Sequence, residues 1–228
     1  MQKIFLSLLL LLLTLLRSSA QEDLKKKAFV FPESSNTAHV VLKTTSQRPL
    51  TSFTLCLRSC TDLPHTAGLF SYASRRYDNE ISLQKEKPNQ YSLYMGTSYV
   101  TFIVPLKPTP PPGGEHVCVS WESATGLVEF WVDGQPLLRK SLMKGHVIVT
   151  EAYILLGQEQ DSFGGSFDIN QSLVGEITDV YMWDRVLSPE EVPKAFYNQE
   201  LPGYLFNWRA LNYTIKGYVV VKPALFSL

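Results

Sequence analysis

The chain has 228 residues, a formal net charge of zero and a hydrophobic fraction of 45%. A neutral chain lacks the basic excess that nucleic acids or acidic membrane surfaces attract, so we expect neither as a partner. The length and apolar content suit one domain with a sizeable core, and no linker or internal repeat divides the sequence.

Residues 1–20 have the pattern of an export signal. Lys3 supplies a positive charge, Ile4–Leu16 is an almost unbroken apolar run, and Ser18-Ser19-Ala20 is a small-residue cleavage site. A membrane anchor is the alternative, but the run is short for a span and a lysine-bearing polar stretch follows it. No later segment is apolar enough to cross a bilayer. The sequence therefore predicts a secreted, extracellular protein with one domain over residues 21–228.

Most of that domain predicts short β-strands separated by turns, because runs rich in β-branched and aromatic residues alternate with turn residues. The clearest unit is an antiparallel meander in which Asp133-Gly134, a strong hairpin signal, leads on to Leu137-Leu138. The expected strands cover residues 28–31, 39–42, 53–57, 91–94, 99–104, 117–121, 127–132, 153–156, 173–177, 180–183 and 217–221.

One short helix is expected near the end of the chain. Ser188 is a capping residue before Pro189 at the first helical position, and Glu191 completes a capping box. Pro193 lies where its ring distorts a helix, so the helix is expected to be short or distorted and to reach about Tyr197. Many strands with one late helix predict an all-β fold, a flattened β-sandwich of jelly-roll type.

The chain contains three cysteines, Cys56, Cys60 and Cys118. An oxidising compartment favours one disulfide and leaves one thiol over. Cys56 and Cys118 both lie in expected strands, which a bridge could join. Cys60 could be a free buried thiol, an intermolecular link or the true partner of Cys118, and these alternatives stay open at this point.

The segment from Gln158 to Gln171 is the richest in potential chemistry. It places three carboxylates and several amides around a Gly-Gly bend, without His or Cys. Such hard oxygen donors are the ligands that calcium prefers, whereas zinc or copper sites normally include imidazole or thiolate. The spacing is not that of an EF-hand. We therefore expect a calcium loop of another kind, with ordinary solvated loop acids as the alternative.

Several motifs together resemble the short pentraxins, and the resemblance covers essentially the whole mature chain. They are Phe29-Val30-Phe31-Pro32, His116-Val117-Cys118-Val119-Ser120-Trp121-Glu122-Ser123, Glu129-Phe130-Trp131-Val132-Asp133-Gly134, Gly157-Gln158-Glu159-Gln160-Asp161-Ser162-Phe163-Gly164-Gly165 and Asn207-Trp208-Arg209-Ala210-Leu211.

The resemblance implies a jelly roll that assembles into a homopentamer and carries two calcium ions per subunit. It implies a disulfide between Cys56 and Cys118. It also implies a lectin of innate immunity that binds phosphate-bearing or carbohydrate ligands through calcium and recruits complement or Fc receptors from its other face.

Carried over position by position, the family's calcium ligands correspond to Asp78, Asn79, Glu159, Gln160 (through its backbone carbonyl), Asp161, Asp168 and Gln171. The four carboxylates among them balance the charge of two calcium ions. The ligand pocket beside the metals corresponds to Ser82, Gln84, Tyr94 and Tyr99. The family's pocket carboxylate is missing from these positions, so a polar ligand such as a sugar phosphate or phosphoethanolamine is favoured over phosphocholine.

Two sequons, at Asn170 and Asn212, are potential glycosylation sites. A glycan on Asn170 would crowd the calcium loop, so we expect that site to be unused, and the use of Asn212 stays open.

Two other function classes are alternatives to a pentraxin-like lectin. The first is a laminin-G-like adhesion module, which predicts a monomer or a fragment of a larger extracellular chain.

A jelly-roll glycosidase would need two carboxylates on one strand, but of Glu129 and Asp133 the second belongs to the Asp-Gly turn. The four histidines are scattered along the chain, and no nucleophile elbow accompanies them. We therefore expect no catalytic residues and no enzymatic activity.

Overall fold

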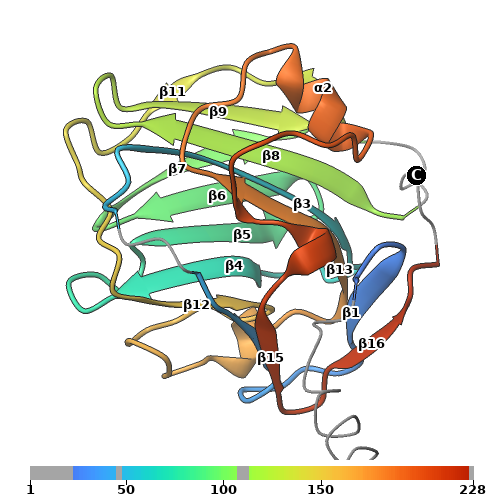
Figure 1. Ribbon diagram of the computed structural model, residues 1–228. Helices are drawn as coiled ribbons and strands as arrows, with labels where there is room; N and C mark the ends of the chain where they lie inside the picture. Colours follow the sequence, from blue (N-terminus) through green and yellow to red (C-terminus); the bar gives the residue numbers. More distant parts are fainter. Residues whose placement is uncertain (1–22, 45–47, 107–112, 226–228) are drawn as a thin grey trace, which may run out of the picture.

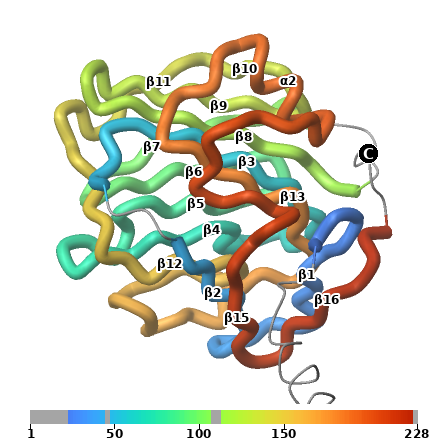
Figure 2. The backbone as a smooth tube through the Cα atoms, viewed as in Figure 1, coloured from blue at the N-terminus to red at the C-terminus, as the bar shows by residue number. Residues whose placement is uncertain are grey.

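The structure is a computed structural model that describes residues 23–44, 48–106 and 113–225. The expected export signal lies outside these residues. Within the described ranges, no helix combines the length and the apolar composition that a membrane span requires. Two antiparallel sheets pack face to face, which confirms the predicted all-β jelly-roll sandwich with one short helix (Figures 1 and 2).

The first sheet has nine strands in the order β10-β9-β8-β3-β13-β1-β16, with β11 paired to β9 and β14 paired to β13. Its strands are β1 (Lys27–Phe31), β3 (Ser52–Cys60), β8 (Glu115–Glu122), β9 (Leu127–Val132), β10 (Gln135–Pro136), β11 (Lys140–Ser141), β13 (Gly175–Trp183), β14 (Tyr204–Phe206) and β16 (Val220–Pro223). The meander around Asp133-Gly134 is present, although its third strand is only the two-residue β10.

The second sheet has seven strands in the order β15-β2-β12-β4-β5-β6-β7. Its strands are β2 (His39–Leu42), β4 (Ala67–Ser74), β5 (Ile81–Lys87), β6 (Gln90–Met95), β7 (Ser98–Ile103), β12 (Ala152–Leu156) and β15 (Tyr213–Lys216). Two 3-10 turns, η1 (Ile169–Gln171) and η2 (Trp208–Ala210), complete the fold.

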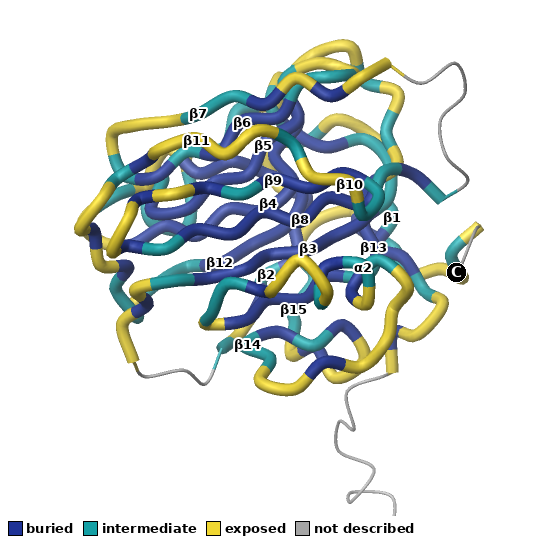
Figure 3. The backbone as a smooth tube through the Cα atoms, turned by 90° about the horizontal axis from the view of Figure 1, so that it is seen from above, coloured by how far each residue is buried: buried dark blue, intermediate teal, exposed yellow. Residues whose placement is uncertain are grey.

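The hydrophobic core fills the space between the two sheets, where the strands are buried along most of their length (Figure 3). Phe102 on β7 and Phe130 on β9 stack across this space with ring centroids 4.6 Å apart. Phe29 on β1 meets Trp208 edge-on at 5.2 Å and so connects η2 to the same core. Alternating side chains on each strand point inward, which explains why both sheets contribute to one core.

Some strand predictions were wrong in their boundaries. The two strands expected at 173–177 and 180–183 form one strand, β13, because a bulge at Asp179, with φ of 55°, keeps the chain paired with β3. The strand expected from Gly217 begins at Val220, because Gly217 adopts a φ of 65° in a turn. Strand β4 was missed, since its sequence AGLFSYAS is rich in small residues with weak strand preference.

The helix α2 (Glu191–Phe196) begins two residues later than expected. Ser188 does not cap it with its side chain, but Glu191 reaches back to accept a hydrogen bond from the Ser188 backbone N–H at 2.9 Å. Arg185 also donates two hydrogen bonds to this carboxylate, at 2.7 and 2.8 Å, and they lower the pKa of Glu191 to about 2. This clamp fixes the helix start in place of a serine cap.

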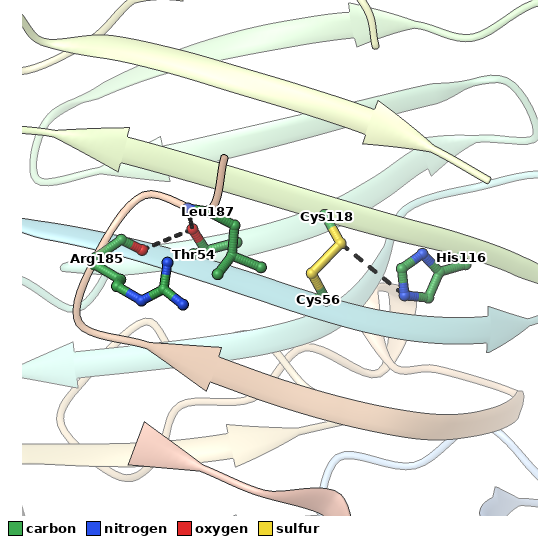
Figure 4. Close-up of a disulfide and its surroundings, with 6 residues drawn as sticks. All are labelled: Thr54, Cys56, His116, Cys118, Arg185 and Leu187. Carbon is green, nitrogen blue, oxygen red and sulfur yellow. Dashed lines mark hydrogen bonds between the residues drawn. A yellow bond between two sulfur atoms is a disulfide. The ribbon is translucent and has the colours of Figure 1, made fainter. Parts of the chain in front are cut away.

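The predicted disulfide between Cys56 and Cys118 is confirmed, and it joins directly opposed residues of β3 and β8 (Figure 4). Its sequence separation of 62 residues corresponds to a contribution of about 4 kcal/mol by the loop-closure argument. His116 lies beside it, with Nε2 4.0 Å from the Cys118 sulfur, and burial lowers the pKa of its imidazole to about 3.

Cys60 is at the exposed end of β3 and forms no disulfide among the described residues. The alternative that Cys60 is the partner of Cys118 is therefore excluded. Partial burial and the nearby Glu176 carboxylate raise the pKa of its thiol, so a smaller fraction of Cys60 is in the reactive thiolate form at neutral pH.

Candidate metal centre

Two segments far apart in sequence meet on one side of the second sheet. The first is the β4–β5 loop, residues 75–80, and the second is residues 157–171, which follow β12. Asp78 and Asn79 lie in the first segment, and the other expected calcium ligands lie in the second. Because β12 pairs antiparallel with β4, its end at Leu156 lies beside Phe70, at the opposite end of β4 from the loop. The second segment then turns back along β4, where Gln160 bonds to Ser71, and so approaches the loop that follows Ser74.

Two buried glutamines attach the second segment to the sandwich. Gln158 donates hydrogen bonds to the backbone carbonyls of Ser35 and Ala38, and Gln160 donates to the Ser71 hydroxyl and to the Tyr153 carbonyl. The Gln160 side-chain oxygen also accepts from the Gly164 backbone N–H at 2.9 Å. Because the side-chain amide of Gln160 is occupied by these hydrogen bonds, its backbone carbonyl is the group that could coordinate a metal.

Gly68 on β4 makes the close approach of this segment possible. A Cβ at position 68 would lie 2.5 Å from the Gln158 carbonyl carbon and 2.7 Å from the Glu159 nitrogen. Both are backbone atoms, which cannot move aside without displacing the segment. Glycine at position 68 therefore lets the Gln158–Glu159 backbone rest directly on the sheet.

The expected Gly-Gly bend is present, with a φ of 80° at Gly164 and a hydrogen bond between the Gly165 N–H and the Ser162 carbonyl. Aromatic contacts hold it down. The Arg75 guanidinium lies 4.3 Å from the centre of the Phe163 ring, and Phe167 packs on His39 at 4.9 Å. Reasoning from the sequence missed these anchors, although two Phe residues in an acidic loop are a recognisable signal.

Glu159 lies at the centre of the site and is only 3% exposed. Burial, followed by the negative charges of Asp161, Asp78 and Asp168, raises the pKa of its carboxyl to about 7, against a hydrogen bond from the Asn79 side chain that lowers it. This electrostatic coupling shows that the structure brings carboxylates from both segments together around Glu159. Because Glu159 itself is buried, its negative charge is poorly screened by solvent and is disfavoured beside the other carboxylates.

The donor set fits a calcium ion, because several of its oxygens are buried without a hydrogen bond. Among the described residues, Asn79 Oδ1, Glu159 Oε2 and Gln171 Oε1 are buried side-chain oxygens with no hydrogen-bond partner. All three belong to the expected ligand set, and buried polar atoms without a partner are rare and costly. A cation that coordinates them would remove this cost.

Asp168 and Gln171 are held by the 3-10 turn η1. Asp168 caps this turn, and one of its carboxylate oxygens accepts from the Asn170 backbone N–H at 2.9 Å and from the Asn170 side chain at 3.0 Å. Asp78 is exposed and accepts from the Asn79 N–H at 2.8 Å. Asp161 is exposed beside Glu159. Asp78, Asn79, Asp161 and Asp168 all lie close enough to Glu159 to affect the pKa of its carboxyl group.

The carboxylates of this site are spread out rather than packed into one tight trio. Among the described residues, the group of His, Cys, Asp or Glu ligand atoms within 4.8 Å of one another is Cys56, His116 and Cys118, whose two sulfurs are bonded to each other. At the acidic site, amide and carbonyl oxygens would have to complete the coordination. Such a mixed oxygen shell is typical of calcium.

The expected ligand pocket lies on the same face of the second sheet, on β5, β6 and β7. Ser82 and Gln84 are buried there, and the Gln84 amide donates to the Ser82 hydroxyl at 3.1 Å. Tyr94 is half-buried and stacks at 5.0 Å on Tyr99, which is 61% exposed. Of these four residues, the two tyrosines are accessible to solvent, and Ser82 and Gln84 are buried.

A carboxylate also belongs to this pocket, and reasoning from the sequence missed it. Glu86 on β5 accepts a hydrogen bond from the Tyr94 hydroxyl at 2.9 Å and another from the Thr66 hydroxyl at 2.9 Å. Burial and this bond to Glu86 raise the pKa of Tyr94 well above its usual value, with a smaller effect from Glu159. Tyr94 therefore lies between Glu86 and the acidic site.

The carboxylates weighed for a glycosidase have other partners. Glu129 on β9 accepts a hydrogen bond from Arg139 at 2.7 Å. Asp133 lies in the turn, with φ of 48°, and accepts from the His116 backbone N–H. An acid and nucleophile pair is therefore not formed by these two residues.

Comparisons with known proteins agree with this geometry. Residues 27–223 match the Pentaxin family. The chain is 48% identical to serum amyloid P-component from Cavia porcellus over 91% of this chain and 92% of that protein. It is 48% identical to human C-reactive protein over 95% and 96% of the two chains, and 48% identical to bovine mucosal pentraxin over 99% and 100%.

Among solved structures, the native heptameric SAP-like pentraxin from Limulus polyphemus has the same fold. Its TM-score is 0.78 at 24% sequence identity, and the match covers 90% of this chain and 98% of that chain. The family match and the near-complete coverage of three relatives agree with the resemblance seen in the sequence motifs. The chain belongs to the Pentaxin family.

Proposed function

We propose that this protein is a secreted, calcium-dependent pattern-recognition pentraxin that binds phosphate-bearing or carbohydrate ligands through two calcium ions per subunit. The observation that carries the proposal is the set of three buried oxygens without a hydrogen-bond partner, on Asn79, Glu159 and Gln171. Carboxylates from two separate segments lie near Glu159, and a cation would be stabilised among them.

In this proposal Asp78, Asn79, Glu159, the Gln160 carbonyl, Asp161, Asp168 and Gln171 would hold the two ions. Bound calcium would supply open coordination positions that take oxygens from an anionic or polyhydroxylated ligand. The described contacts place the ligand residues. Residues 157–171 are held against the second sheet by Gln158, Gln160 and Gly68, and η1 orients Asp168 and Gln171.

Ligand preference would be set by the Tyr94–Tyr99 surface and by Glu86. A phosphate on the metals would place an attached ammonium group over the tyrosine rings, where cation–π attraction and the Glu86 carboxylate both favour it. The sequence-based preference for a polar ligand rested on the loss of a pocket carboxylate. With Glu86 at this position, phosphoethanolamine is favoured among the ligands considered.

The protein would act by binding rather than by catalysis, as a homopentamer that presents several sites on one face. Multivalent contact with a repetitive microbial or damaged-cell surface could raise avidity by about 10²–10⁴ over a single site. The opposite face would be available for complement or Fc receptors. Light scattering separates this proposal from a laminin-G-like adhesion module, which predicts a monomer.

The proposal is tested by passing the purified protein over phosphoethanolamine, phosphocholine and agarose matrices, in calcium and in EDTA. We expect capture in calcium, release by EDTA, and the strongest retention on phosphoethanolamine. Equal retention in calcium and EDTA, or no capture on any matrix, would refute calcium-dependent recognition of these ligand classes.

A further inference from the structure

A buried hydrogen-bonded pair lies directly behind the β4–β5 loop. Glu80, with 0% exposure, follows the expected ligands Asp78 and Asn79. Its Oε1 lies 2.6 Å from Nε2 of His146, and its Oε2 accepts from the Ser74 hydroxyl at 2.5 Å. A carboxylate buried this completely is tolerated only when both oxygens have donors.

The same pair shapes the loop. The Ser74 oxygen that donates to Glu80 also accepts the backbone N–H groups of Arg76 and Tyr77, at 3.1 and 3.0 Å. The loop end is fixed separately by the Asn79 carbonyl, which accepts from the Gly96 N–H at 2.7 Å. Glu80 therefore connects the first turn of the loop to its last residue.

His146 belongs to a different part of the chain, the connection between β11 and β12. Its backbone N–H bonds to the Met143 carbonyl, and its ring lies between Tyr77 of the loop at 5.9 Å and Trp121 of β8 at 6.3 Å. The imidazole is thus held by the other sheet and by its own turn. It offers Glu80 a donor that is also anchored outside the loop, by Trp121 and by the Met143 carbonyl.

We propose that His146 is a positioning residue for the metal site, because its hydrogen bond to Glu80 holds the β4–β5 loop in the position where Asn79 and Asp78 lie beside Glu159. His146 touches neither metal nor ligand in this account and acts through Glu80. Without its donor, one oxygen of a fully buried carboxylate loses its partner, and the loop must shift to expose Glu80 to water. This inference rests on the calcium site of the proposed function.

Groups that hydrogen-bond a metal ligand directly typically change metal affinity by about 10–100-fold when they are removed. His146 acts one residue further out, through Glu80, so we expect His146→Leu, which keeps similar bulk without a donor, to weaken calcium binding by about 10-fold, the lower end of this range, in isothermal titration. His146→Gln, which loses the same ring but keeps a terminal N–H, should recover most of the affinity. The difference between the two variants isolates the hydrogen bond from the loss of ring packing.

His116→Leu is the matched control, since His116 is also buried but lies beside the disulfide on β8. It should lower the melting temperature in EDTA without changing the calcium affinity. If His146→Leu does not fold, Ser74→Ala removes the other donor to Glu80 and should also weaken calcium binding. Limited proteolysis in EDTA gives a second readout, with faster cleavage of the β4–β5 loop expected in His146→Leu.

Wild-type affinity in both His146→Leu and Ser74→Ala would overturn the inference, and so would a His146→Gln variant as weak as His146→Leu. Absence of calcium binding by the wild-type protein is a different result, because it refutes the proposed function itself.

Discussion

The Asn79 side chain lies close enough to the carboxyl group of Glu159 to lower its pKa, although one residue lies between β4 and β5 and the other follows β12. This contact joins the two segments of the acidic site before any ion is considered. It leaves Asn79 Oδ1 and Glu159 Oε2 buried without a partner among the described residues. A calcium ion would coordinate both, and the following predictions examine this relationship.

Replacement of Glu159 by alanine should remove ligand binding without affecting assembly. Glu159 is the carboxylate that the other three acidic groups influence, so its loss should leave too few buried oxygens to hold the ions. The measurement is retention on a phosphoethanolamine matrix in calcium, with light scattering to follow assembly. Glu33→Ala is the control, because Glu33 is exposed in the β1–β2 connection. Calcium-dependent retention of Glu159→Ala would contradict the site assignment.

The calcium-free protein should have an unusual pH dependence of stability. The pKa of Glu159 is about 7 in the fold and 4.5 in the unfolded reference. Between these values the folded state holds a proton that the unfolded state has lost, so the free energy of unfolding falls as pH rises through this range. The full effect is about 3 kcal/mol.

A second buried group, His116, has a pKa lowered to about 3, so its titration makes the free energy of unfolding rise with pH below 6.5. The effect of Glu159 is therefore isolated by comparing the wild-type protein with Glu159→Gln, because His116 contributes equally to both. In EDTA, the variant should gain stability over the wild-type protein as pH is raised from 5 to 8. In calcium the order should reverse. Parallel melting curves for the two proteins across this range would show that Glu159 does not carry the shift.

Replacement of Glu86 by glutamine should change ligand preference more than calcium binding. The substitution keeps an acceptor oxygen for only one of the two hydroxyls, of Tyr94 or Thr66, because the other carboxylate oxygen becomes an NH₂ donor, and it removes the negative charge near the tyrosine surface. A partly exposed charge pair contributes about 1 kcal/mol, or roughly a fivefold change in affinity. We expect retention on phosphoethanolamine to fall by this amount while retention on agarose stays constant. An equal fall on both matrices would mean that Glu86 supports the site in another way.

Asn212 should carry a glycan when the protein is secreted, and Asn170 should not. Asn212 is exposed at the start of β15, whereas the Asn170 side chain donates to the Asp168 carboxylate at 3.0 Å. Mass spectrometry before and after glycosidase treatment distinguishes the two sequons, with Asn212→Gln as the matched variant. A glycan found on Asn170 would show that the bond to Asp168 is not maintained during secretion.

The chemistry of the continuous segment is visible in the sequence, whereas the approach of the β4–β5 loop is not. Glu159, Asp161 and Asp168 stand in one segment, so their chemistry is visible without knowledge of the fold. Asp78 and Asn79 entered only through the family resemblance, because composition carries no information on which distant loops meet. The pairing of β4 with β12 and the return of the following segment along β4 supply that information, and β4 was missed for its small residues.

Glu86 shows a second limit of prediction from the sequence, because it was not included among the pocket residues. It follows Ser82 and Gln84 at alternate positions on one strand, and this spacing indicates that the three side chains share one face of the sheet. A register shift between Lys85 and Lys87, however, ends the regular pairing with β6 beside it. The anchoring roles of Gly68 and His146 were also invisible, since each depends on a contact with a segment remote in sequence.

Calcium titration of the wild-type protein by isothermal calorimetry tests the central claim most directly. The account predicts two calcium ions per chain, with loss of binding in Glu159→Ala and normal binding in Glu33→Ala. A protein that takes up no calcium, or a Glu159→Ala variant that binds two ions as the wild type does, would contradict it.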